Sequence, residues 1–134
     1  MRTRGLWQPV TVSLRRLFPS ASFVGCGDIR VSEATDQSAV CAAGGLFAAV
    51  RGTRHDGLGY VDTALERGAG SLLVPHPVST AEVPQCIVHD VRAAYAVLCQ
   101  AVAGHPSRRL NVAGITGTDG KTTVAWLLRS IWQA

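Results

Sequence analysis

The stretch that decides the fold of the carboxyl-terminal part is Leu110-Asn-Val-Ala-Gly-Ile-Thr-Gly-Thr-Asp-Gly-Lys-Thr-Thr123. Its first six residues form a short apolar run that predicts a strand over 110–115. The helical pattern of 124–132 follows at once, with Leu127, Leu128 and Ile131 along one face. A strand, a glycine-rich turn, a lysine, a hydroxyl residue and a helix in this order are typical of a phosphate-binding loop.

The residue types of this turn suit a polyphosphate. Glycines at 117 and 120 let the backbone approach the phosphates, and amide groups at the positive end of a helix attract them. Lys121 would neutralise the terminal phosphates and the Thr122 hydroxyl would hold Mg²⁺. The sequence of this turn differs by one position from the GxxxxGK[ST] pattern. The alternative to a phosphate-binding loop is an ordinary glycine-rich turn with a surface lysine. Lys121 is, however, the sole lysine among 13 basic residues, which favours the phosphate loop.

Composition excludes several classes of protein. The chain has 134 residues, of which 47% are apolar and 16% charged, so it has enough apolar material for a folded core. No uninterrupted apolar stretch reaches the roughly 18 residues that span a bilayer, and we expect no membrane association. The net charge of +4 is spread along the chain and does not require a nucleic-acid partner. Four cysteines without a CxxC pair indicate reduced, mostly core residues and no metal site. Arg15 and Arg16 interrupt any apolar signal segment, so we expect a cytoplasmic protein.

Upstream of residue 105 the pattern alternates between strands and helices, which predicts an α/β fold. A short helix or turn is expected within 6–18, ended by Pro19. Helices are expected over 60–67 and, with Asp90 as N-cap and Gly104 as terminator, over 90–103. Strands are expected over 29–31, 46–50, 71–74 and 86–88. The exposed connection 105–109 divides a domain of residues 1–104 from a final strand–loop–helix unit of residues 105–134.

Several segments of the sequence resemble a known protein family. The segment 114–123, preceded by His-Pro-Ser-Arg-Arg-Leu at 105–110, resembles the ATP-binding start of the Mur ligases, most closely that of the tripeptide synthetases. The segment 35–47 is similar to the family's Asp-Ser-Arg…Pro-Gly-Asp-Leu-Phe stretch, and 52–57 to its following Gly…Asp-Gly loop. Gly68-Ala-Gly70 matches the turn before the next strand. The resemblance covers residues 12–134.

The resemblance implies a small UDP-binding amino-terminal Mur ligase domain, followed by the first βα unit, with its P-loop, of a truncated central ATPase domain. It implies the ATP- and Mg²⁺-dependent ligation of an amino acid to UDP-N-acetylmuramoyl-L-alanyl-D-glutamate, a step of peptidoglycan biosynthesis. Lys121 and Thr122 take the catalytic positions, with Thr122 on the metal. The ATP loop comprises Gly117, Thr118, Asp119, Gly120, Lys121, Thr122 and Thr123. The UDP-substrate positions are Asp36, Ser38, Thr53, Arg54 and His55.

Four positions depart from the family pattern. Gln37 and Ala39 replace the Asp and Arg of Asp-Ser-Arg, Gly45 replaces the Asp of Pro-Gly-Asp, and Asp119 replaces the usual Asn of the ATP loop. The further Mg²⁺ ligands, a lysine that is carbamylated in the family and the part that selects the amino acid all belong to later segments of the family's chains. We therefore expect an amino-terminal ligase fragment that is inactive alone. The alternative is a free-standing UDP-sugar or nucleotide-binding module with a vestigial P-loop.

Overall fold

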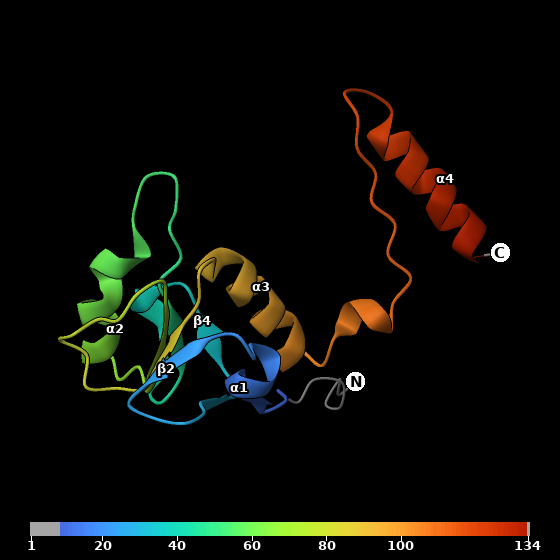
Figure 1. The fold of residues 1–134 in the computed structure, drawn as a ribbon. Coiled ribbons are helices and arrows are strands. Elements are labelled where there is room, and N and C mark those ends of the chain that lie inside the picture. Colours follow the sequence, from blue (N-terminus) through green and yellow to red (C-terminus); the bar gives the residue numbers. More distant parts are fainter. Residues whose placement is uncertain (1–8, 134) are drawn as a thin grey trace.

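The computed structural model describes residues 9–133, and its centre is a five-stranded sheet with helices on both faces (Figure 1). The strand order is β2-β7-β6-β5-β4, in which β2 is antiparallel to β7 and the other neighbours are parallel. The strands are β2 (Ser22–Val24), β4 (Ala34–Thr35), β5 (Leu46–Ala48), β6 (Ser71–Val74) and β7 (Gln85–Ile87). The expected α/β class is thereby confirmed.

Shorter elements surround this sheet. An antiparallel pair, β1 (Val12–Ser13) and β3 (Arg30–Val31), lies beside α1 (Leu14–Leu17). The remaining helices are η1 (Ser38–Val40), η2 (Gly57–Tyr60), α2 (Val61–Glu66), α3 (Val91–Val102), η3 (Pro106–Arg108) and α4 (Lys121–Gln133). No helix in the described part of the chain is long and apolar enough to cross a membrane.

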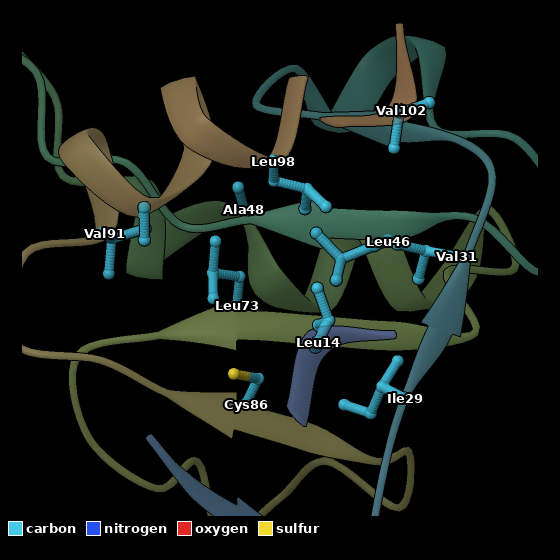
Figure 2. Packing of buried hydrophobic residues seen from close by; sticks show 11 residues of the cluster. Leu14, Ile29, Val31, Leu46, Ala48, Leu73, Cys86, Val91, Leu98 and Val102 are labelled. Carbon is cyan, nitrogen blue, oxygen red and sulfur yellow. The ribbon is translucent and has the colours of Figure 1, made fainter. Parts of the chain in front are cut away.

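Side chains alternate between the two faces of the sheet, as the period of two in a strand requires. Leu46, Ala48 and Leu73 point toward α3, where they pack with Leu98. Figure 2 shows this cluster beneath α3, with Leu14 of α1 completing it. Their neighbours in sequence point the other way and pack against α2: Phe47, Ala49, Leu72 and Val74, with Val61 and Ala64 of the helix. Both faces of the central strands are therefore buried.

Helix α3 has the ends that the sequence predicts. The Asp90 carboxylate accepts a hydrogen bond from the Ala93 N–H (2.9 Å), which satisfies a free amide of the first turn. Gly104, with φ of 70°, follows the last turn in the left-handed region that favours glycine. The prediction for 90–103 is confirmed with both caps, and α2 confirms the helix expected over 60–67.

One predicted element is wrong. Residues 110–115 form no strand in the described chain, and Leu110 and Val112 are exposed. A strand exists only where a neighbouring strand pairs with it, and the described residues offer none there. The predicted helix or turn within 6–18 is observed as α1 alone, while residues 6–8 lie outside the described range.

The four thiols are free, as expected, although only Cys41 and Cys86 are buried. Burial raises the pKa of the Cys86 thiol to about 11 and also raises the pKa of Cys41, so both remain protonated at neutral pH.

Candidate functional site

The residues expected to contact a UDP-sugar follow two neighbouring strands. Asp36 and Ser38 come after β4, and the loop with Thr53, Arg54 and His55 comes after β5. Because β4 and β5 pair in parallel, both segments leave the sheet at its carboxyl edge. Ligands of open α/β sheets bind outside this edge. The fold therefore brings both predicted segments to a common side of the sheet.

The loop after β5 is closed at its base by backbone contacts. Arg51 and Asp56 pair as an isolated antiparallel bridge, and the Gly52 N–H donates to the His55 carbonyl (2.8 Å). The Asp56 carboxylate accepts from the Leu58 N–H (3.1 Å) and so caps η2. Thr53, Arg54 and His55 at the tip are exposed, and the His55 ring stands edge-on to Tyr60 with centroids 6.2 Å apart. The loop presents polar and cationic side chains from a closed base.

Helix α3 begins at this edge and contacts both segments. The Arg92 guanidinium, in the first turn, donates to the Arg51 carbonyl (2.6 Å). Tyr95, one turn further along, lies near Asp36, and burial is the main cause that raises the pKa of its phenol. Nothing in the sequence pattern singled out Arg92, because its partner is 41 residues away.

Beside the Asp36–Ser38 segment lies an open, mostly apolar cavity of about 400 Å³. Thr35 of β4, Val40 of η1, Gly45 before β5 and Cys99 of α3 line it. Ser38 is half-buried at the start of η1, where its carbonyl accepts from the Cys41 N–H (3.4 Å). None of the five predicted substrate residues is among the described residues that line the cavity. Asp36 and Ser38 therefore lie between the lining residues Thr35 and Val40 in the sequence, and the cavity is lined by neither them nor the loop 53–55.

The second group is the loop before α4. Gly117 and Gly120 have φ of 143° and 75°, a region that favours glycine, so the turn needs both residues. The Lys121 ammonium folds back over the turn and donates to the carbonyls of Gly117 (2.6 Å) and Thr118 (3.2 Å). An ammonium has three N–H donors, so one remains for a ligand. The lysine is thus held at the loop by backbone carbonyls.

This loop fits a polyphosphate. Within the described chain, the backbone N–H groups of 118–123 donate to no acceptor, and the first bond of this region runs from the Val124 N–H to the Gly120 carbonyl (3.0 Å). Free amides at a helix N-terminus, next to an ammonium, form an anion site. Thr122 and Thr123 stand in the first turn with exposed side chains, and Asp119 is exposed just before it.

The segment before the loop lies beside the helix that follows it. Ala113 and Ile115 line an open groove of about 300 Å³ together with Ala125, Leu128 and Trp132 of α4. Figure 1 shows α4 apart from the five-stranded sheet, and α4 has no buried residue. The residues of the loop 117–123 and the carboxyl-edge residues therefore form two separate groups in the described chain.

The chain is similar in sequence to curated ligases and synthetases. No protein-family model matches the chain. It is 46% identical over 102 residues to the UDP-N-acetylmuramoyl-L-alanyl-D-glutamate–2,6-diaminopimelate ligase of Aquifex aeolicus, a match that covers 76% of this chain and 21% of the relative. It is 41% identical over 109 residues to the UDP-N-acetylmuramyl-tripeptide synthetase of Deinococcus radiodurans, covering 80% of this chain and 22% of the relative. The chain thus spans about a fifth of the length of these curated relatives.

Solved structures agree on the fold. The UDP-N-acetylmuramoylalanyl-D-glutamyl-2,6-diaminopimelate–D-alanyl-D-alanyl ligase of Acinetobacter baumannii superposes with a TM-score of 0.68 at 25% identity, over 98% of this chain and 29% of that one. The MurF ligase of Thermotoga maritima in complex with ADP superposes with a TM-score of 0.52 at 26% identity, over 68% of this chain and 21% of that one. The chain therefore belongs to the Mur ligase family and matches about a fifth of the length of its tripeptide-synthetase members.

Proposed function

We propose that this chain supplies two binding sites of an ATP-dependent ligase that adds an amino acid to UDP-N-acetylmuramoyl-L-alanyl-D-glutamate in peptidoglycan biosynthesis. The first site is the carboxyl edge of the sheet, with Asp36, Ser38, Thr53, Arg54 and His55, for the UDP-substrate. The second is the loop 117–123, for Mg-ATP. Because the chain spans about a fifth of its curated relatives, the activity we assign to it is binding, with ligation requiring further segments.

One observation carries the ATP site: the amides of 118–123 donate to no acceptor, and the Lys121 ammonium of the same segment is folded over the loop. The MurF ligase of similar fold is in complex with ADP, which supports a nucleotide as a ligand of this chain. The names of the relatives support the UDP-substrate, and the closed cationic loop after β5 suits its diphosphate.

The residues of the loop 117–123 would have the following roles. The amides of 117–120 cradle the phosphates, and Lys121 offsets the charge on the β- and γ-phosphates. The Thr122 hydroxyl is the residue of this loop that would hold Mg²⁺. When bound, Mg-ATP supplies the phosphoryl group that activates a carboxylate for attack by an amine. Asp119 adds a negative charge beside the phosphates and so opposes their binding.

Calorimetric titration of the purified, folded chain tests both sites separately. We expect binding of UDP-N-acetylmuramoyl-L-alanyl-D-glutamate and, independently, of Mg-ATP. Lys121→Ala should weaken Mg-ATP binding by roughly 10- to 100-fold, the loss expected for a charged hydrogen bond, and should leave UDP-substrate binding unchanged. Arg108→Ala, which removes an exposed cation outside both sites, is the control.

Each of the two titrations has a result that would contradict the site it tests. A folded chain that does not bind the UDP compound would overturn the assignment of the carboxyl edge. Undiminished Mg-ATP binding by Lys121→Ala would overturn the assignment of the loop.

A second candidate is a free-standing module that binds a UDP-sugar or nucleotide. It is favoured by the sheet domain, which has complete cores on both faces without any contribution from α4. This candidate predicts UDP-substrate binding together with no measurable binding of Mg-ATP. A reading frame that continues past residue 134 into the rest of a ligase would favour the first proposal.

A further inference from the structure

Arg92 makes a contact that the proposed sites do not explain. Its guanidinium reaches from the first turn of α3 to the Arg51 carbonyl (2.6 Å), which joins α3 to the base of the loop after β5. Arg51 is also the residue that pairs with Asp56 to close this loop. The bond is therefore made at the point where the loop leaves the sheet.

The donor comes from a rigid part of the fold. Arg92 stands between Asp90, which caps α3 through the Ala93 N–H, and Ala94, which is buried in the core. Val91 beside it is buried as well. A donor whose backbone is fixed in this way can hold a loop in one position at a lower entropic cost than two mobile groups would require.

The contact also leaves the cation available. Its acceptor is a neutral carbonyl, so the bond does not neutralise the guanidinium, and a guanidinium has five N–H donors. Arg51, Arg54 and Arg92 are all exposed. Two of these arginines belong to the loop and the third holds it, so the loop is presented among positive charges, as a diphosphate requires.

We propose that Arg92 is a positioning residue for the UDP-substrate: through the Arg51 carbonyl it holds the loop 51–56 so that Thr53, Arg54 and His55 meet the diphosphate and sugar. This inference rests on the proposed function of the carboxyl edge. The diphosphate portion of the ligand is the part whose binding depends on the contact, because the loop carries cationic side chains to it.

Two measurements on the full chain test this inference. Amide hydrogen exchange of the ligand-free chain reports on the loop through the Gly52 and Gly57 N–H groups, which donate to His55 and Val50. Calorimetry with UDP-N-acetylmuramoyl-L-alanyl-D-glutamate reports on affinity. In Arg92→Ala we expect these two amides to exchange faster, while the exchange rates of the β6 amides stay unchanged. We expect the affinity for the UDP compound to fall about tenfold. Arg92→Lys should have a smaller effect on both the exchange rates and the affinity, because the ammonium keeps the positive charge but lacks the planar set of donors of the guanidinium.

Arg15→Ala is the matched control. Arg15 is likewise an exposed arginine that donates to a backbone carbonyl, that of Gly27, on another part of the domain. It should leave loop exchange and affinity unchanged.

Each result decides the inference. Faster loop exchange together with weaker binding supports it. Unchanged exchange in Arg92→Ala overturns the positioning role even if affinity falls, and unchanged affinity overturns the role in ligand binding. If the unsubstituted chain binds no UDP compound, the proposed function fails and the ligand role fails with it, whereas the exchange data still decide whether Arg92 holds the loop.

Discussion

Gly57→Ala should destabilise the sheet domain strongly, because this glycine lies directly against the backbone that follows β5. A Cβ at position 57 would stand 2.5 Å from the Ala49 carbonyl carbon and 2.6 Å from the Val50 nitrogen and oxygen. Ordinary contact begins at 3.4 Å, so the backbone must move by about 0.9 Å. Such overpacking costs about 1–3 kcal/mol. The Gly57 N–H bond to the Val50 carbonyl (3.2 Å) adds about 1 kcal/mol if it is lost.

Thermal unfolding followed by far-ultraviolet circular dichroism measures this effect. A loss of about 3 kcal/mol lowers the midpoint of a domain of about 100 residues by roughly 12–24 °C. Gly59→Ala is the matched control, because it lies in the same short helix and its Cβ would meet no heavy atom within 4 Å. The control should change stability by less than about 0.5 kcal/mol. A Gly57→Ala midpoint within about 2 °C of the parent would refute the close approach of this loop to β5.

Three further changes test other parts of the molecule. Hydrogen bonds from the Arg15 N–H and the Ser13 hydroxyl hold the pKa of Asp28 below its ordinary value of 3.8. The carboxylate therefore stabilises the fold at neutral pH, and acid denaturation should remove this contribution below about pH 4, less steeply in Asp28→Asn. Leu98→Ala, at a fully buried position under α3, should cost about 2–5 kcal/mol in urea unfolding. Asp119→Asn should tighten Mg-ATP binding on the order of threefold in calorimetry, the repulsion of unit charges about 7 Å apart in water.

Each of these three predictions has a result that would contradict it. Identical acid transitions for Asp28→Asn and the parent would exclude a role for this carboxylate in stability. Val97→Ala, on the exposed side of the same helix, should cost much less than Leu98→Ala, and equal costs would contradict the observed packing. Mg-ATP affinity of Asp119→Asn no tighter than that of the parent would show that the carboxylate does not face the phosphates.

Local chemistry made several features predictable. Asp90 and Gly104 mark the ends of α3 because capping depends on residues within one turn of each other. The glycine turn before α4 was predictable because its glycines lie within a few positions of each other, and Gly117 and Gly120 adopt the positive φ that such a turn needs. The residues 71–74 formed a strand as expected because a continuous apolar run suits a strand buried on both faces.

Tertiary structure decided what depends on partners distant in the sequence. The run 110–115 has strand composition yet pairs with nothing in the described chain, because a strand is defined by its neighbour. Arg92 reaches Arg51 only once β5 and β7 are placed on either side of β6. The sequence by itself determined the α/β class, the helix ends and the glycine turn before α4, since these depend on neighbours within a few residues. Only the folded sheet placed Asp36, Ser38 and the loop 51–56 at one edge, because strand order is a long-range property of packing.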